Sequence, residues 1–583
     1  MRLEFDEVLI HLGDFGRYQK LVYSLLCFCM IPSCILILSP AFISADVPHV
    51  CKISTELLSK NNATVGMYIP YEMNDNRCQP SSCSRYDLHT RNMNESIDYT
   101  TRNNITCKTK WATMACDNGW SFDIANHRSS IATEWELVCD RAWLREVATS
   151  MLYIGVLAGT LVVSPLSDRY GRRLCIFIAL PCNILFGLCS AFAPSFPLFL
   201  VSQLLLGGTF VGIYIITYSY VLEWIGPSCR AFVCNSVVVF YSFAYMALAG
   251  LAYLIRDWRQ LSLVLCIPQV FMLAYFWCIP ESPRWLMSRG DIKEAEVIIL
   301  KAARVNKADI SPLLPKLRQY YEEERNSRLE AERMETKKKH LNFLDLIRTP
   351  ILRKRCVNIF CHCHHRTSIS LVYYGVSLNT STLPGDEYLL FFLAGVMEVP
   401  ACFLAIYLVD RFGRTIPLSA FFAIAGVGCI GCQLFPEDLN YLSIGVAMIG
   451  KLGASAAFWT AYMHTSELLP TVLRTTGLGA ASCFGRLGSI LAPFVQLLSS
   501  TWKPLPFIIY GCVSFAAGAM ILLLPETKGQ PLPNTIEDIE YSSGSKSDVT
   551  STFEEKDGKR VMWLSLVDLN YTSDVENMKP TIL

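Results

Sequence analysis

The sequence predicts an all-α membrane protein with twelve transmembrane helices in two pseudo-symmetric halves of six. Three observations lead to this fold class. Of the 583 residues, 52% are hydrophobic and 17% are charged, whereas soluble domains average about 25% charged residues. Apolar stretches long enough to cross a bilayer recur along most of the chain. In addition, three short motifs occur twice at a nearly constant spacing. The net charge of +1 excludes the basic field that is typical of nucleic-acid-binding proteins.

Twelve stretches are apolar enough to span a membrane, and in chain order they cover residues 21–43, 147–166, 174–193, 197–221, 231–254, 260–279, 357–378, 388–409, 416–435, 441–463, 475–498 and 504–524. The first stretch is too long for the apolar region of a signal peptide, and Ile43 does not suit a cleavage site before Asp46. We therefore interpret it as a helix. The chain then divides into an N-terminus (1–20), a first half (21–280) that contains a long loop (44–146), a linker (281–356), a second half (357–524) and a tail (525–583).

Arginines in the short loops place these segments on the two sides of the membrane. The loops after spans 2, 4, 8 and 10 all lie on one side, and they carry Arg169, Arg172, Arg173, Arg230, Arg411, Arg414 and Arg474. Short loops rich in Lys and Arg stay in the cytoplasm. We therefore expect both termini to be cytoplasmic and segment 44–146 to be extracellular, in a multi-pass protein of the plasma membrane.

The 44–146 segment has the composition of an extracellular cap. It contains six of the 24 cysteines, an even number suited to three disulfide bonds in an oxidising compartment: Cys51, Cys78, Cys83, Cys107, Cys116 and Cys139. Their pairing is one of 15 alternatives. The segment also contains three Asn-x-Ser/Thr sites for glycosylation, at Asn62, Asn94 and Asn104.

Three repeated motifs indicate that the two halves are homologous. Asp168-Arg-Tyr-Gly-Arg-Arg recurs as Asp410-Arg-Phe-Gly-Arg 242 residues later, Glu223 to Arg230 recurs as Glu467 to Arg474 after 244 residues, and Pro-Glu-Ser at Glu281 recurs as Pro-Glu-Thr after 245. Parallel six-helix halves around a midplane cavity are the architecture of alternating-access transporters. We expect the charged residues to form salt bridges within and between the halves, as a cytoplasmic gate: Asp168, Arg169, Arg172, Arg173, Glu223, Arg230, Glu281, Asp410, Arg411, Arg414, Glu467, Arg474 and Glu526. The alternative is that these arginines only anchor the topology. Gly171 and Gly413 suit a tight turn inside the first motif.

Three charged residues lie inside apolar spans: Glu398, Lys451 and Arg486. A Lys or Arg near the centre of a membrane helix costs about 2.5–3.5 kcal/mol on insertion scales, so such residues usually face a cavity and belong to a substrate pathway. Alternatively, Glu398 and Lys451 neutralise each other as a structural pair. Arg486 would then be the charge without a match, on a helix face with Ser482 and Ser489.

Aromatic residues accompany these charges. Helical spacing puts Lys451, Phe458 and Tyr462 on one face of span 10. Further aromatic residues lie in spans 4 and 7, at Tyr214, Tyr218, Tyr373 and Tyr374. Aromatic walls around one or two charges suit amphipathic organic ions, because ring faces contact apolar groups and attract ammonium groups. Aromatic residues at this spacing also occur in ordinary helix packing, and that alternative stays open.

Over roughly residues 10–540 the chain resembles the major facilitator superfamily and, within it, the organic ion transporters of solute carrier family 22. The resemblance rests on the repeated motifs, on Glu281-Ser-Pro-Arg-Trp-Leu286, on Leu524-Pro-Glu-Thr-Lys-Gly-Gln-Pro-Leu-Pro533 and on Trp135-Glu-Leu-Val-Cys-Asp140. It departs from the superfamily at Ser164, where a glycine is usual. The resemblance implies the major facilitator fold, with substrate-lining aromatics on helices 4, 7 and 10. It also implies that an Arg seven residues before the helix 11 proline, here Arg486, favours a substrate with a carboxylate.

The sequence therefore predicts a secondary transporter of small organic ions, favouring a carnitine-like zwitterion or an organic anion. An organic cation transporter, a sugar porter and a non-transporting receptor on the same fold are the alternatives. We expect neither enzymatic activity nor a cofactor, and coupling to sodium or protons stays open. The absence of a Walker loop argues against ATP-driven transport. We interpret the Cys361–Arg366 cluster as polar helix-end packing rather than a metal site. The C-terminus, with Thr581 and Leu583, fits a PDZ-domain ligand.

Overall fold

In the computed structural model, each of the twelve predicted spans falls on a helix. The structure describes residues 5–53, 69–74, 77–87, 112–123, 129–310, 350–468, 471–524, 526, 551–556 and 559–564, with a few positions between 312 and 319. Eight helices in this described part are long and apolar enough to cross a membrane, and two further apolar helices are shorter. The predicted all-α membrane fold is confirmed.

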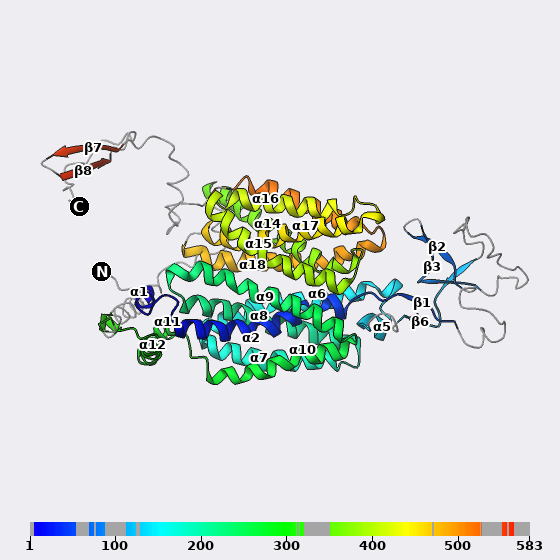
Figure 1. Cartoon of the computed structure of the whole chain (residues 1–583), viewed down its shortest axis with the longest axis horizontal. Helices are drawn as coiled ribbons and strands as arrows, with labels where there is room; N and C mark the ends of the chain where they lie inside the picture. The colour runs from blue at the N-terminus through cyan, green and yellow to red at the C-terminus, as the bar shows by residue number, and fades with distance from the viewer. Residues whose placement is uncertain are drawn as a thin grey trace, which may run out of the picture.

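The helices of the two halves follow one another along the chain. The first half contains α2 (Arg17–Leu38) with the short α3 (Pro40–Ile43), α6 (Trp143–Tyr170), α7 (Arg172–Ala191), α8 (Phe196–Trp224), α9 (Pro227–Leu254) and α10 (Trp258–Met272) with η3 (Leu273–Trp277). The second half contains α14 (Pro350–Leu378), α15 (Glu387–Phe412), α16 (Thr415–Gly431), α17 (Asn440–Leu468), α18 (Thr471–Leu497) and α19 (Leu505–Ile521). Short 3-10 segments follow or precede some of these helices: η5 (Asn379–Thr382), η6 (Glu437–Leu439) and η7 (Leu498–Ser500). In Figure 1 the helices of the second half, in yellow and orange, form one layer beside the blue-to-green layer of the first.

Small residues allow the helices within each half to pack closely. A Cβ atom on Gly155 of α6 would lie 1.9 Å from the carbonyl oxygen of Leu204 in α8, and one on Gly207 would lie 1.9 Å from that of Leu152. In the second half, Gly428 of α16 faces Gly450 of α17 in the same way. Small residues at such contacts let helix backbones approach, which is the usual basis of helix association in membranes.

The long loop of the first half folds into short antiparallel strand pairs beyond one end of the bundle (Figure 1). The pairs are β1 (His49–Cys51) with β6 (Trp120–Phe122), β2 (Tyr71–Asn74) with β3 (Arg77–Pro80), and β4 (Ser84–Tyr86) with β5 (Thr113–Ala115), and they are followed by α5 (Ile131–Trp135) and η2 (Cys139–Arg141).

Disulfide bonds join parts of this loop that are distant in sequence. Cys51 is bonded to Cys116, and Cys83 to Cys139, which confirms the prediction that the loop contains disulfides. Cys107 lies outside the described residues, the side chain of Cys78 is not described, and the three glycosylation sites also lie outside the described part.

An ion pair also joins two distant parts of the loop. The buried Arg85 donates from Nε and Nη2 to the two carboxylate oxygens of Asp117, at 2.7 and 2.6 Å. These hydrogen bonds lower the pKa of the Asp117 carboxyl below its usual value.

The opposite end of the bundle is covered by segments from the N-terminus and the linker. The helices α1 (Phe5–His11), α11 (Pro283–Arg289) and α12 (Ile292–Asn306) lie there (Figure 1). In the tail, β7 (Ser551–Lys556) pairs with β8 (Lys559–Leu564). Thr581 and Leu583 lie outside the described residues.

Candidate functional site

A buried ion pair lies in the second half, between Glu398 of α15 and Lys451 of α17. Both residues are at most 1% exposed, and Lys451 Nζ lies 2.8 Å from Glu398 Oε1. The same carboxylate oxygen accepts hydrogen bonds from the hydroxyls of Tyr373 at 2.8 Å and Ser455 at 3.0 Å. Lys451 also donates to the hydroxyl of Ser377 at 2.7 Å. The structure therefore brings these two charges together, and each is held by several partners.

Aromatic rings from both halves surround this pair. The ring of Tyr373 stacks on Phe458 with 4.6 Å between centroids, and Lys451 Nζ lies 3.9 Å from the Tyr373 centroid. Tyr374 contacts Tyr153 of α6 at 4.9 Å. On α9, Tyr245 lies 5.4 Å below the Lys451 ammonium group. The aromatic wall thus includes Tyr153 and Tyr245, which the sequence analysis did not single out, because a tyrosine in an apolar span carries no signal of which helix it faces.

The other predicted aromatic residues are less buried or are not described. Tyr214 is partly buried and stacks on Phe210 of its own helix at 5.5 Å. Tyr218 is 37% exposed. The side chain of Tyr462 lies outside the described part of the structure. The described aromatic rings around the Glu398–Lys451 pair therefore belong to spans 2, 5, 7 and 10.

Two arginines are buried on neighbouring helices of the second half. Arg486 of α18 is 8% exposed, and Arg366 of α14 is 2% exposed. The Nε atom of Arg366 lies 3.9 Å from the position that a Cβ would occupy on Gly485, the residue before Arg486. His365, the neighbour of Arg366, packs edge-on against the ring of Phe422 at 5.1 Å. The side chains of residues 361–363 are not described.

The charged motif of the first half forms a compact network at the end of the bundle near α11. Arg172 contacts Asp168 at 2.6 Å and Glu223 at 3.1 Å. Arg173 donates to the carbonyl oxygen of Phe276 at 2.6 Å. Glu281 accepts hydrogen bonds from the backbone N–H groups of Arg172 and Arg173, at 3.1 and 3.2 Å, and so caps the start of α7.

The second half repeats this cap. Glu526 accepts from the backbone N–H groups of Arg414 at 2.8 Å and Thr415 at 3.0 Å, at the start of α16. Before each cap, the motif glycine has a left-handed backbone, with φ of 105° at Gly171 and 92° at Gly413. Burial raises the pKa of the Glu281 carboxyl, although the backbone N–H groups of the cap act in the opposite direction.

The remaining motif residues are exposed or not described. Asp410, Arg169 and Arg411 are exposed, and Arg411 donates to the Tyr407 hydroxyl at 2.8 Å. The side chains of Arg230, Glu467 and Arg474 are not described. Within the described residues, the ion pairs that the gate motifs form join groups of the same half.

At the end that carries the long loop, the two halves are in direct contact. Tyr245 of α9 stacks on Phe391 of α15 with 4.1 Å between centroids. Phe42 contacts Phe391 at 4.8 Å, and the Ser150 hydroxyl donates to the carbonyl oxygen of Ile490 at 2.9 Å. The structure is therefore closed between the halves at this end.

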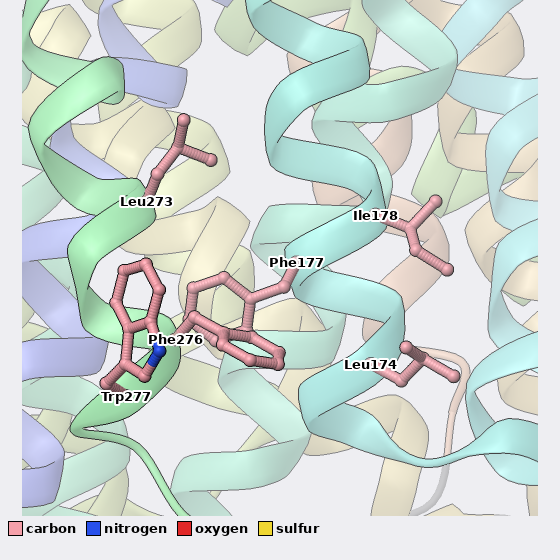
Figure 2. Close-up of a pocket in the computed structure, with 6 residues that line it drawn as sticks. All are labelled: Leu174, Phe177, Ile178, Leu273, Phe276 and Trp277. Carbon is pink, nitrogen blue, oxygen red and sulfur yellow. The ribbon is translucent and has the colours of Figure 1, made fainter.

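A separate cavity of about 260 Å³ lies between α7 and η3 (Figure 2). Its lining is apolar and consists of Leu174, Phe177, Ile178, Leu273, Phe276 and Trp277. These side chains offer no charged group to an ionic substrate, and the cavity belongs to the first half alone.

Two parallel halves, buried charges between aromatic walls and matched charged caps define a transporter of the major facilitator type. The family model described as "Sugar (and other) transporter" matches residues 89–538. The chain is 35% identical to the "Organic cation transporter protein" of Drosophila melanogaster, over 94% of this chain and 97% of that protein. It is 35% identical to the human "Organic cation/carnitine transporter 2", over 93% and 95%. The human "Solute carrier family 22 member 13" is 34% identical, over 93% and 94%.

Among solved structures, the xylose transporter XylE from E. coli in its inward-open conformation is similar in fold. Its TM-score is 0.54 at 21% identity, and the match covers 68% of this chain and 89% of that one. The chain belongs to the sugar (and other) transporter family and, within it, to solute carrier family 22. The resemblance expected from the sequence motifs is confirmed.

Proposed function

We propose that the chain is a plasma-membrane transporter that moves small organic ions by alternating access and favours substrates with a carboxylate. A carnitine-like zwitterion and an organic anion are the two substrate classes. The observation that carries this proposal is Arg486, whose guanidinium group is buried on α18 inside an apolar span. A guanidinium stays protonated and binds a carboxylate through two parallel hydrogen bonds.

The aromatic wall suits the rest of such a substrate. Tyr373 and Phe458 stack on each other beside the Lys451 ammonium group, and ring faces contact apolar groups or an ammonium group equally well. The names of the relatives refer to organic cations and carnitine. They support an organic ion as substrate, and they also favour the second candidate, an organic cation transporter. One observation argues against a simple cation as substrate. A cation would need a carboxylate to bind, and the carboxylate of Glu398 already has Lys451, Tyr373 and Ser455 as partners.

The charge at Arg486 provides the test. Arg486→Lys should weaken transport of a zwitterion or an organic anion, and Arg486→Asp should abolish it, because loss of one partner of a buried charged pair costs roughly 2–5 kcal/mol. This corresponds to about 30-fold to several-thousand-fold in affinity. The measurement is a competition profile of anions, zwitterions and cations at equal surface expression. Arg304→Lys, on the exposed face of α12, is the matched control. An unchanged profile with unchanged affinities in Arg486→Lys would overturn the proposal.

We also propose that both termini are cytoplasmic and that segment 44–146 is extracellular. Two disulfides in the loop and the position of α1, α11 and α12 at the other end of the bundle support this orientation (Figure 1). A glycosidase should lower the apparent mass of surface-expressed protein, and replacing Asn62, Asn94 and Asn104 together should abolish the shift. A shift that persists in the triple variant would contradict the assignment of these sites.

Coupling and partners extend the proposal further. Uptake measured with and without sodium, and across a proton gradient, distinguishes sodium coupling from proton coupling, and no dependence on either ion would exclude both.

The C-terminal Thr581 and Leu583 are proposed as a PDZ ligand, because a PDZ domain adds the peptide as a strand and binds its terminal carboxylate. Removing Leu583 should then abolish binding to a PDZ domain, and unchanged binding would reject this partner.

A further inference from the structure

The apolar cavity between α7 and η3 opens on the outer side of the first half. In Figure 1, α7 and α10 lie at the side of the first half that is farther from the second half. Of the lining residues, Trp277 is 79%, Ile178 55% and Leu174 45% exposed, and the rings of Phe177 and Phe276 meet edge to face between the helices at 5.2 Å (Figure 2). Both helices are long and apolar enough to cross a membrane. The cavity is therefore a groove that lipid chains can reach, and we call it the lipid-facing groove.

The lipid-facing groove lies at the level of the charged motif of the first half. Leu174 belongs to the first turn of α7, which begins at Arg172. On the other side of the groove, Trp277 ends η3 shortly before Glu281, the residue that caps α7. A tryptophan at this position is typical of the boundary between the hydrocarbon and the head groups. A lipid in the groove would therefore present its head group to the motif arginines, on the cytoplasmic side in the proposed orientation.

The guanidinium group of Arg173 lies at the edge of the groove. It lies 4.3 Å from the centroid of the Phe276 ring, and its Nη2 atom donates to the carbonyl oxygen of Phe276 at 2.6 Å. Its Nε atom is buried and has no hydrogen-bond partner in the described part of the chain. A buried donor without a partner is costly, which indicates that a bound group supplies an acceptor.

The carboxylates of the motif have other partners than this guanidinium group. Asp168 and Glu223 form ion pairs with Arg172. Glu281 accepts from the backbone N–H groups of Arg172 and Arg173. Within the described residues, the Arg173 guanidinium group thus forms no ion pair.

Two further arginines at this end do not share the position of Arg173. The guanidinium group of Arg169 lies beside the ring of its neighbour Tyr170 at 5.5 Å, and Arg284 pairs with Asp6 at 3.4 Å. The arginines and carboxylates of the first-half motif are equal in number, so the region carries no excess of positive charge. What distinguishes Arg173 is its position, next to an apolar groove and without a carboxylate partner among the described residues.

We propose that the lipid-facing groove binds an anionic phospholipid, with an acyl chain between α7 and η3 and the phosphate group at Arg173. A guanidinium group binds a phosphate through parallel hydrogen bonds, and the apolar lining packs against the acyl chain. An ammonium group in the lipid head would be repelled by the guanidinium group, so a head group without one is preferred. Basic sites of this kind on the cytoplasmic side of membrane proteins bind anionic lipids. The site is separate from the substrate pathway.

The first experiment uses Trp277 as the reporter, in the full chain reconstituted into phosphatidylcholine nanodiscs with a minor share of phosphatidylglycerol. Bromine atoms on an acyl chain quench tryptophan emission, and a matched share of either lipid is brominated. The part of the quenching that is lost in Trp277→Phe belongs to Trp277. We expect brominated phosphatidylglycerol to quench this part at a share about fivefold lower than brominated phosphatidylcholine, because one arginine near the membrane surface contributes about 1 kcal/mol. Equal quenching by the two lipids would overturn the inference.

The second experiment assigns the preference to Arg173. Arg173→Gln should make the two lipids quench equally, whereas Arg173→Lys should keep part of the preference, because lysine binds a phosphate as a point charge. Arg169→Gln removes an exposed arginine of the same motif and is the matched control, which should keep the full preference. An unchanged preference in Arg173→Gln, or an equal loss in Arg169→Gln, would contradict the site.

The third experiment separates a lipid site from a site for any phosphate, and it needs no variant, so it holds even if Arg173→Gln does not fold. Phosphatidylglycerol added to the purified protein in detergent should raise the midpoint of thermal unfolding, since a ligand of the folded state stabilises it. Inorganic phosphate and glycerophosphoglycerol lack the acyl chains and should not raise it at the same concentration. An equal rise with inorganic phosphate, or no rise with phosphatidylglycerol, would overturn the lipid site.

Discussion

At the scale of single residues, the Glu398–Lys451 pair shows how a membrane helix accommodates charge. Each member alone would be a buried ion in an apolar span, and such an ion is expensive. Here the carboxylate has three partners, and the ammonium group bonds to Ser377 as well and lies over the Tyr373 ring. The polar groups of α14, α15 and α17 are thereby joined into one network in the core of the second half.

The network predicts a non-additive pattern of stability. Lys451→Met leaves Glu398 as an unpaired buried charge and should destabilise the protein by about 3–5 kcal/mol. The double variant Lys451→Met with Glu398→Gln removes both charges and should recover most of this loss. Thermal unfolding of the purified protein provides the measurement. The losses of stability in Lys451→Met and in Glu398→Gln are compared with the loss in the double variant. If the loss in the double variant equals the sum of the two single losses, the ion pair does not contribute as described.

At the scale of elements, the repeated motifs build one structural device twice. The Asp-Arg-x-Gly-Arg turn ends one helix, and a glutamate from a distant motif caps the next helix, with Glu281 on α7 and Glu526 on α16. A carboxylate at a helix N-terminus is favoured by the free N–H groups and by the helix dipole. The motifs that define the internal repeat in sequence therefore meet in space within each half.

The turn glycines predict a specific loss of stability. A Cβ on Gly171 would lie 2.5 Å from Glu281 Oε2, and one on Gly413 would lie 2.6 Å from Glu526 Oε2, with φ positive at both positions. Gly171→Ala and Gly413→Ala should each destabilise the protein by about 1–3 kcal/mol. Gly250→Ala on α9 is the control, because a Cβ there meets nothing within 4 Å, and alanine suits a helix better than glycine. A midpoint of thermal unfolding in Gly171→Ala equal to that of Gly250→Ala would contradict the role of the turn.

At the scale of the whole molecule, the described contacts differ between the two ends of the bundle. Aromatic stacking between Tyr245 and Phe391 and the hydrogen bond from Ser150 to Ile490 join the halves at the end with the long loop. At the other end, the described ion pairs of the gate motifs connect groups of one half. Alternating access requires the contacts at the loop end to separate during the transport cycle.

A cross-link at the closed end should therefore stop transport. The hydroxyl oxygen of Ser150 lies 2.9 Å from the backbone carbonyl oxygen of Ile490. In a variant with cysteines at both positions, a short cleavable reagent that joins two thiols should abolish uptake. Uptake should return when the link is cleaved by a reductant. Each single-cysteine variant treated in the same way controls for reaction with native cysteines. Full uptake by cross-linked protein would show that the halves do not separate there.

Hydrophobic length and the repeated motifs were enough to predict the twelve helices and their division into halves. Both are local properties of the chain, because a helix that crosses a membrane satisfies its own backbone hydrogen bonds. The charges at Glu398, Lys451 and Arg486 were evident for the same reason, as each interrupts an apolar span. The burial of Arg366 and Tyr153 was not evident, because Arg366 lies at the polar start of a span and Tyr153 resembles any other aromatic residue of a membrane helix.

The sequence by itself determined the number of spans, the internal repeat, the family and the charged residues that interrupt the apolar spans. The tertiary structure decided which of these residues are neighbours: that Lys451 pairs with Glu398, that Arg366 lies beside α18 at Gly485, and that the halves close at the loop end. The physical reason is that helices in a bilayer are each stable before they pack. Their rotation and pairing depend on small-residue contacts and polar networks between segments far apart in the chain, which no local pattern specifies.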